Sequence, residues 1–401
     1  MNGRGASGVD GAMKLGFGLA LLLLGAACGR KATPGQRDAA TTTPANAGAP
    51  EAGAHAEVEA GSDGRGCDFT PGFHGTVAGQ DVYMRLREDP KDHALAGRYF
   101  YARTGLDIGL AGHVDGRGEV DLVEGDPAHS TGRFTGRCVD GVVSGTWSNG
   151  KTAQPFSLQA VAPRENPLVA TKRLKLVRPV KTVGTFGMKE CVYEQTVFEL
   201  FGAKNPAAEA RVNQQDARAL TPRIVSKDTY EDAKKCESGM TATFAVTIIA
   251  TFRGFVTVES GGSTGYDGAA HPGNFVDYAR TTWDLETGKP LGEKDLFARF
   301  PTALVERCVQ AYGDAPKGNA IMADGHTFDV SARGVHIYGA NYPHAASILT
   351  GQGPTLTWAA LLREGALRND SPAQRLWAGI PPGKPGDVEC LLDDAKQRYT
   401  P

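Results

Sequence analysis

The sequence lacks the close-spaced motifs of thiolate zinc sites and metallopeptidases. Its 7 cysteines include no C-x-x-C pair, and its 9 histidines include no H-E-x-x-H set. His336 and His344 flank an expected turn, but two neighbouring surface histidines usually share no ligand. We therefore expect no metal, no cofactor and no thiol redox centre.

A strong charge of one sign is also missing. The formal net charge is −2, and 22% of the residues are charged. No basic excess points to nucleic acid, and no acidic run suggests a solvating tail. Glycine is abundant, with 52 residues, and aromatic residues make up 8% of the chain. This composition favours a β-rich protein with many turns.

The apolar run near the N-terminus is too short to cross a membrane. Residues Leu15–Ala27 number 13, whereas a spanning helix needs about 20. Lys14 precedes the run, and small residues followed by Cys28 end it, which predicts a signal peptide. The ending resembles a bacterial lipobox, although Gly25 stands where leucine is preferred. We expect a lipidated Cys28 and a membrane anchor, in the outer membrane if the cell has two; the alternative is ordinary signal-peptide cleavage.

Export changes what the other 6 cysteines indicate. An even number of cysteines in an oxidising compartment favours disulfides. Proximity along the chain predicts sequential pairing, although other connectivities are possible. The expected bonds are Cys67–Cys138, Cys191–Cys236 and Cys308–Cys390.

Composition divides the chain into successive parts. Residues 1–28 are the expected lipoprotein signal peptide. Residues 29–66 have almost no large apolar side chain, which predicts a disordered tether. Residues 67–162 are expected to form a small β-domain, 163–180 a linker, and 181–401 an α+β domain.

Residues 67–162 contain short runs with period-2 alternation, separated by turn residues. Such strands suit an antiparallel meander closed into an eight-stranded barrel, because closure removes exposed edges. The residues expected on one face are Val82, Met84 and Leu86, then Leu106, Ile108 and Leu110, then Val120 and Leu122. The interior is either packed or holds one small ligand. A lipid or small-molecule carrier is excluded if Tyr99, Tyr101, Phe134 and Trp147 fill it.

Residues 181–401 mix both periodicities. Asn205 and Pro206 open an expected helix, and residues 241–260 form two expected strands that bend near Gly254. A later helix is expected to place Phe300, Leu304, Cys308 and Ala311 on one face. We therefore predict one antiparallel sheet with two or three packed helices.

A basic cluster lies in the expected linker. Its members are Lys172, Arg173, Lys175 and Arg178. A solvated strand face is the expectation for them, and contact with anionic lipid or wall polymer is the alternative.

The stretch "SGGSTGYDGAAHPGNF", residues 260–275, contains a G-x-S-x-G pattern centred on Ser263. A nucleophile elbow needs a strand, a tight turn and then a helix. Gly268, Pro272 and Gly273 prevent a helix here, so we expect a glycine-rich loop and no catalytic residue. An envelope hydrolase acting on wall glycan or ester remains the alternative if Ser263 lines a closed pocket beside a base.

Three elements carry a resemblance to a known family. They are a G-G-A-H-P-like turn at 268–272, a "D-L-x-T-G-K-x-L-x-x-x-D-L-F" run at 284–297, and a hairpin followed by "Y-x-x-A" at 342–345. Residues 190–362 thereby resemble the paired extracytoplasmic module of lysozyme-sensing anti-sigma factors of the RsiV type. The same module forms the non-catalytic N-terminal part of the peptidoglycan deacetylase PdaC.

The resemblance implies binding without catalysis. A lysozyme-like muramidase or peptidoglycan would be the ligand, and neither sigma-factor binding nor deacetylase chemistry is implied by this module. The candidate contact residues are Tyr266, Asp267, His271, Asp284 and Tyr342. Because Pro272 holds His271 extended, a structural hydrogen bond, for example near Asp284, is the alternative role for this histidine.

Overall fold

The computed structural model describes residues 67–125, 130–220, 227–268, 274–312, 327–339 and 351–392. Cys28 and the expected tether lie outside these residues. In the described part of the chain, no helix is long and apolar enough to cross a membrane.

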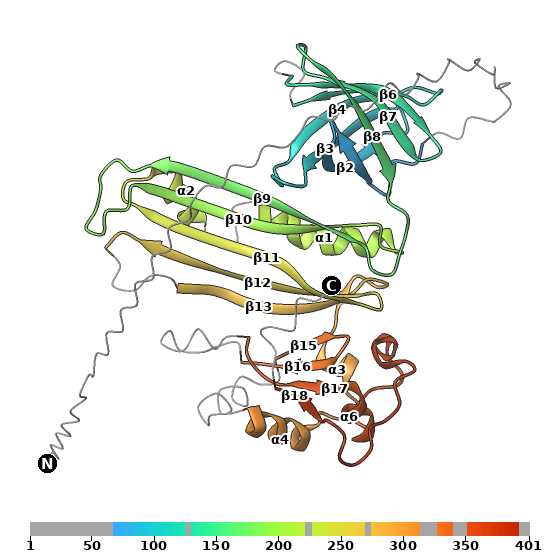
Figure 1. The fold of residues 1–401 in the computed structure, drawn as a ribbon, viewed down its shortest axis with the longest axis vertical. Helices are drawn as coiled ribbons and strands as arrows, with labels where there is room; N and C mark the ends of the chain where they lie inside the picture. Colours follow the sequence, from blue (N-terminus) through green and yellow to red (C-terminus); the bar gives the residue numbers. More distant parts are fainter. Residues whose placement is uncertain are drawn as a thin grey trace, which may run out of the picture. The chain divides into compact units, whose positions relative to one another are not determined.

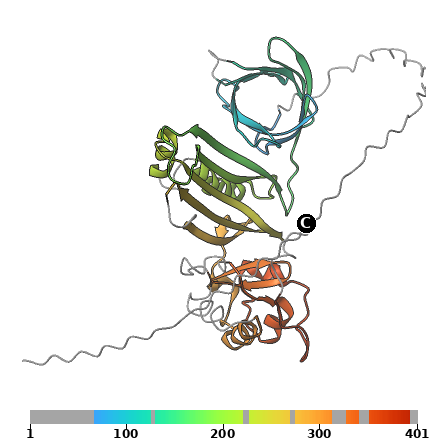
Figure 2. The ribbon, with the colours of Figure 1, turned by 60° about the vertical axis from the view of Figure 1, so that its left-hand side comes forward.

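The first described element is a closed antiparallel barrel of eight strands that pair in sequence order, with β8 returning to β1 (Figure 1). Figure 2 views this barrel as a ring. The strands are β1 (Phe73–Val77), β2 (Gln80–Glu88), β3 (Ala94–Tyr101), β4 (Ile108–Val114), β5 (Glu119–Glu124), β6 (Arg133–Val139), β7 (Val142–Ser148) and β8 (Ala153–Ala160). The predicted barrel is therefore confirmed.

The barrel interior is packed with apolar and aromatic side chains. The expected inward residues of β2 and β5 are buried, but Leu106 is 48% exposed, because β4 begins only at Ile108. Phe134 packs edge-on against Tyr99 and Phe156, with ring centroids 5.4 and 5.1 Å away. Each such ring stabilises the fold by about 1.5–3 kcal/mol when buried. These rings occupy the space that a carrier would need.

A six-stranded sheet follows, in the order β14-β13-β12-β11-β10-β9 (Figure 1). Its strands are β9 (Leu168–Pro179), β10 (Glu190–Phe201), β11 (Met240–Phe252), β12 (Phe255–Tyr266), β13 (Asn274–Asp284) and β14 (Lys289–Pro290). The prediction of a linker over 163–180 is wrong for most of its length, because β9 pairs with all of β10.

The sheet also differs from the expected antiparallel one. Strands β10 and β11 are parallel, and parallel neighbours need a long crossover, usually helical. The helices α1 (Pro206–Leu220) and α2 (Lys227–Lys235) lie in that crossover. Asn205 caps α1 as predicted, since its side-chain oxygen accepts from the backbone N–H groups of Ala207 and Ala208.

The described residues that follow β14 include a smaller sheet of four strands in the order β15-β16-β17-β18. Its strands are β15 (Phe328–Ser331), β16 (Gly334–Ile337), β17 (Thr355–Thr357) and β18 (Cys390–Leu391), and its helices are α3 (Glu293–Leu296), α4 (Thr302–Tyr312), α6 (Trp358–Arg363) and the 3-10 helix η3 (Pro372–Trp377). Leu304 and Cys308 face the core as predicted, but Phe300 precedes α4 and Ala311 is exposed.

The three predicted disulfides are present. Cys67 lies 6.1 Å from Cys138 between Cα atoms. The corresponding distances are 5.6 Å for Cys191–Cys236 and 5.9 Å for Cys308–Cys390. Because such bonds persist in oxidising compartments, the structure agrees with export.

Candidate functional site

Ser263 is not part of a nucleophile elbow. Residues 260–266, expected as a loop, continue β12, and Ser263 pairs with Thr243 of β11 and Phe275 of β13. The Ser263 hydroxyl lies 2.9 Å from that of Thr243. Glycine suits this strand because a Cβ at Gly262 would lie 2.6 Å from the Thr243 carbonyl oxygen, next to a bulge. The G-x-S-x-G pattern therefore marks closely paired strands.

Asp267 is placed at the end of β12, where it holds a neighbouring turn. Its carboxylate accepts from the backbone N–H groups of Phe186 and Met188, at 2.7 and 2.9 Å. A Cβ on Gly184 would lie 2.7 Å from the Asp267 carboxyl carbon, so a larger residue there would displace this carboxylate. Asp267 thus positions the turn between β9 and β10.

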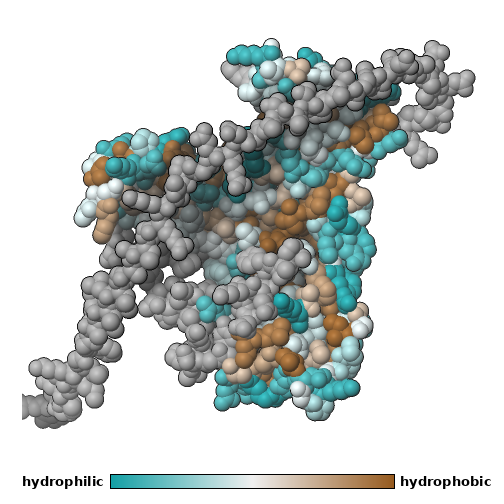
Figure 3. All heavy atoms as spheres, in the orientation of Figure 1, coloured by the Kyte–Doolittle hydropathy of each residue, from teal (hydrophilic) through white to brown (hydrophobic). Residues whose placement is uncertain are grey.

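The turn and the end of β12 expose three large apolar side chains, which we call the apolar tip. They are Val183 (56% exposed), Phe186 (67%) and Tyr266 (42%). Both segments lie at the left-hand end of the sheet in Figure 1, where Figure 3 shows brown side chains among teal ones. Tyr266 was predicted as a contact residue, whereas Val183 and Phe186 were missed because they lie some 80 residues away in the sequence.

Asp284 lies at the opposite end of β13 from Asn274, and it is buried. Its carboxylate accepts from the Glu286 backbone N–H at 2.9 Å and from the Thr287 hydroxyl at 3.1 Å. Arg375 donates to it at 2.5 Å. Asp284 therefore stabilises the β13–β14 turn. His271 and Tyr342 lie outside the described residues.

A buried arginine cluster joins the two sheets and was not predicted from the sequence. Arg280 of β13 donates to Glu259 of β12 at 2.8 Å and to Asp329 of β15 at 2.9 Å. The side chains of Arg280 and Asp329 are each 7% exposed. Since a buried charge is costly unless it is paired, these ion pairs fix how β13 meets β15.

Three rings complete this cluster. His336 Nδ1 lies 2.9 Å from the Asp329 carboxylate, and the His336 ring stacks on Tyr338 with centroids 5.3 Å apart. Tyr278 donates to Glu259 at 2.8 Å. The signal that could have found the cluster is period-2 spacing, because Tyr278 and Arg280 lie two residues apart on β13, and Tyr338 lies two residues after His336 of β16.

Burial and neighbouring charges shift the pKa of three members of the cluster, Tyr278, Arg280 and Tyr338. Burial raises the pKa of both Tyr278 and Tyr338. Burial opposes the charge of Arg280, but Asp329, Tyr278 and Glu259 raise its pKa by more, so that it lies above its ordinary value. Arg280 pairs with the carboxylates of both Glu259 and Asp329. This geometry suits a fixed structural link between the two sheets.

A second ion-pair network surrounds Glu199 in β10. Arg85 of β2 and Lys172 of β9 approach this carboxylate to 2.5 and 3.4 Å, and Arg98 of β3 to 3.2 Å. Lys172 is 3% exposed, so the prediction of a solvated basic face is wrong for this residue. Burial raises the pKa of Glu199, but Lys172, Arg98 and Arg85 lower it by more, and it lies below its ordinary value.

Within the described ranges, no group of three histidine, cysteine, aspartate or glutamate residues is arranged to hold a metal ion.

Comparison with known proteins gives structural likeness alone. No family model and no curated protein matches the chain. A DUF3298 family protein from Pseudomonas aeruginosa PAO1 is 17% identical, over 55% of this chain and 100% of that one, with a TM-score of 0.36. A member of the DUF3298 family from Bacteroides fragilis is 13% identical, over 54% of this chain and 100% of that one, with a TM-score of 0.34.

Proposed function

We propose that this chain is a non-catalytic protein of the bacterial cell envelope that binds a protein or glycan through the apolar tip. The observation that supports this proposal is the exposure of Val183, Phe186 and Tyr266 at one end of the sheet. A single exposed apolar residue is ordinary, whereas a group of them marks a contact surface.

The tip is also held in place before any ligand binds. Asp267 fixes the turn through two backbone hydrogen bonds, and the Asp267 N–H donates to the Gly239 carbonyl at 2.8 Å. A preordered contact loop loses less conformational entropy on binding, which strengthens affinity.

The surroundings of the tip have the polar rim that interfaces usually show. Lys181, Lys189, Glu190 and Glu237 are exposed beside it. The family resemblance suggests the ligand: a lysozyme-like muramidase or peptidoglycan. Lipidation at Cys28 would hold the chain at the membrane, with the described residues presented beyond the tether.

Retention assays test this proposal. The purified chain is presented to hen lysozyme and, separately, to insoluble peptidoglycan. We expect one of them to be retained, and Phe186→Ala to weaken retention about tenfold or more, as removal of a central aromatic contact does.

The control is Val139→Ala, which shortens an exposed apolar residue (53%) in β6 of the barrel. This variant should retain the ligand as the unaltered chain does. Asp267→Ala should weaken retention with the fold intact, because the turn loses its anchor. Retention of neither ligand, or equal retention by Phe186→Ala, would contradict the proposal.

A further inference from the structure

The strand β9 lies at one edge of the six-stranded sheet and has β10 as its neighbour on one side only (Figure 1). It pairs with β10 residue for residue, from Leu168 to Pro179. A strand at the edge of a sheet presents backbone N–H and C=O groups that a further strand can bind. The outer side of β9 is therefore a place where this sheet can accept another strand.

Alternate residues of β9 direct their backbone groups away from β10. The Arg173 N–H donates to the Gly105 carbonyl, which lies between β3 and β4 of the barrel, at 2.8 Å. Arg173 is therefore an outward residue. Because outward and inward residues alternate along an antiparallel pair, Lys175 and Val177 also direct their N–H and C=O groups outward.

The two ends of this outer side are covered, and its centre is open. Gly105 covers one end, and just beyond the other end the Lys181 N–H donates to the Cys236 carbonyl at 3.1 Å. In the described part of the chain, no acceptor lies within hydrogen-bond distance of the N–H groups of Lys175 and Val177. Their side chains lie at the surface, since that of Lys175 is 56% exposed and Val177 is 38% exposed.

The open edge is basic. Residues 168–181 contain no carboxylate and five cations, which are Lys172, Arg173, Lys175, Arg178 and Lys181. Lys172 is buried and pairs with Glu199, whereas the other four are exposed. Among the described residues, the ion pair of these four is that of Lys175 with Glu194, at 3.5 Å.

Neighbouring elements do not cancel this charge. The unburied carboxylates of β10 are Glu190 and Glu194, which are two against the four exposed cations of the edge. The helix α2, which also contacts β9, contains three cations and three carboxylates. An excess of positive charge therefore remains beside the open backbone groups.

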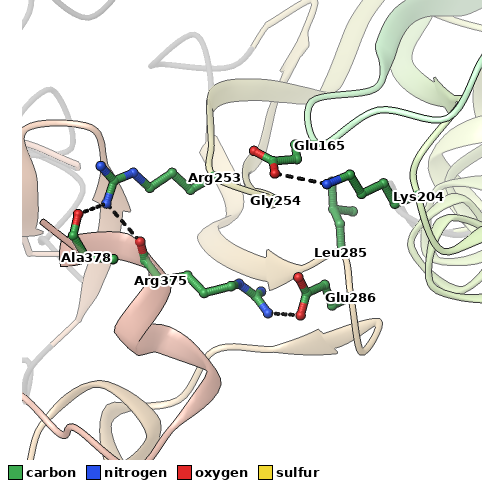
Figure 4. A pocket seen from close by; sticks show the side chains of 8 residues that line it. All are labelled: Glu165, Lys204, Arg253, Gly254, Leu285, Glu286, Arg375 and Ala378. Carbon is green, nitrogen blue, oxygen red and sulfur yellow. Dashed lines mark hydrogen bonds and ion pairs between the residues drawn. The ribbon is translucent and has the colours of Figure 1, made fainter.

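The pocket of about 380 Å³ beside the β11–β12 turn differs in this respect. Lys204 pairs with Glu165 at 2.9 Å, and Arg375 pairs with Glu286 (Figure 4). With Asp284, which also pairs with Arg375, three carboxylates balance the three cations around that pocket. The edge of β9 is thus the part of the sheet whose charge points to an anionic partner.

A second copy of the chain does not suit this edge. Antiparallel pairing of two β9 strands would bring Arg173 and Lys175 of one copy close to the same residues of the other. Like charges on facing strands are destabilising, and lysines on edge strands are a usual means of preventing self-pairing. A partner strand that carries carboxylates meets no such repulsion.

We propose that the open centre of β9 binds an extended acidic segment of another protein, which adds a strand to the sheet. The Arg173 carbonyl and the backbone groups of Lys175 and Val177 supply the hydrogen bonds. In such strand addition, main-chain bonds give affinity and alternate side chains give specificity. Because side chains of a strand alternate between faces, Arg173 and Lys175 share one face, and carboxylates two residues apart on the partner would pair with them.

Matched peptides test this proposal. The full chain is titrated with fluorescein-labelled SEVEVES, with the same peptide carrying lysine in place of glutamate, and with the acidic peptide carrying N-methylated amides. Affinity is measured by fluorescence anisotropy. We expect the acidic peptide to bind, and each of the other two to bind at least tenfold more weakly. Salt should weaken the binding of the acidic peptide, because it screens the charges.

Hydrogen exchange locates the bound peptide. The amide N–H groups of Lys175 and Val177 are followed by NMR with and without saturating acidic peptide. Their exchange should slow at least tenfold when the peptide binds, because both groups then donate to it.

Variants separate this edge from other surfaces. Lys175→Glu reverses a charge at the centre of the edge and should weaken binding at least tenfold. Val177→Pro removes an outward N–H that β10 does not use and should weaken binding similarly, with its folding checked by thermal unfolding. The control is Arg137→Glu, which makes the same change of charge at an exposed position of β6 in the closed barrel. This control and Phe186→Ala at the apolar tip should change nothing, so the outcome is independent of the proposed function.

Four results would overturn the proposal. The first is equal binding of the N-methylated peptide, which would assign the edge to anionic polymers or lipids that need charge alone. The others are no binding of the acidic peptide, undiminished binding by Lys175→Glu, and unchanged exchange at Lys175 and Val177 with the peptide bound. If Val177→Pro does not fold, Lys175→Glu and the exchange measurement still decide.

Discussion

The barrel and the six-stranded sheet use different means to fix their strands. In the barrel every strand pairs with its neighbours in sequence, and rings such as Phe134 fill the interior. In the sheet, β10 and β11 pair in parallel across a helical crossover. The buried Glu199 of β10 pairs with Lys172 of β9 and with two arginines of the barrel strands β2 and β3. Short-range pairing with apolar burial is directly visible in a sequence, whereas long-range pairing with buried charge is not.

The largest loss of stability is expected when an aromatic ring is removed from the barrel interior. Phe134→Ala should lower the free energy of unfolding by about 3–5 kcal/mol, because it removes buried contacts and leaves a cavity. Urea unfolding of the chain measures this, with Val139→Ala, an exposed position at 53%, as the control near zero. A loss below about 1 kcal/mol would show that the barrel does not depend on its ring packing.

The stabilisation by the buried ion pairs around Glu199 should depend on pH. Glu199→Gln leaves Arg85, Arg98 and Lys172 without their shared carboxylate, and we expect a loss of about 3 kcal/mol at pH 7. Because the pKa of Glu199 is lowered in the fold, its stabilisation is present above the unfolded pKa of about 4.3 and is lost as pH falls through the folded value.

The measurement is unfolding by urea at pH 7 and at pH 3, for the unaltered chain and for Glu199→Gln. The difference between them should shrink on acidification. A difference that stays constant between the two pH values would show that the charge of Glu199 does not contribute.

The smallest effect is expected for an ion pair on the barrel surface. Arg133 and Asp121 pair across β6 and β5, with side chains 59% and 25% exposed, and a hydrogen bond from Arg133 lowers the pKa of Asp121. Exposed pairs contribute only about 0–1 kcal/mol. Asp121→Asn should therefore shift the urea midpoint little, and less in 1 M salt. A loss comparable to that of Glu199→Gln would remove the distinction between exposed and buried pairs.

The site could be predicted only in part from the sequence. Tyr266 was recognised because it stands beside a glycine-rich stretch, but its partners Phe186 and Val183 belong to a distant turn. Asp267 and Asp284 were predicted as contact residues because they are polar residues within motifs. In the structure, however, Asp267 accepts from a backbone N–H group and Asp284 accepts from Arg375. The role of a side chain depends on the residues that it contacts in the folded chain. A local sequence pattern does not identify those residues when they lie far away in the sequence.

The sequence alone determined the barrel strands and the α1 cap at Asn205, because period-2 alternation and capping are local properties. It favoured the sequential disulfide pairing among several possible connectivities, and the structure has that pairing. Only the tertiary structure decided that β9 joins the sheet, that Ser263 lies within a strand, and that Arg280 meets Asp329. These contacts join segments far apart in the chain, and their geometry follows from how whole sheets pack.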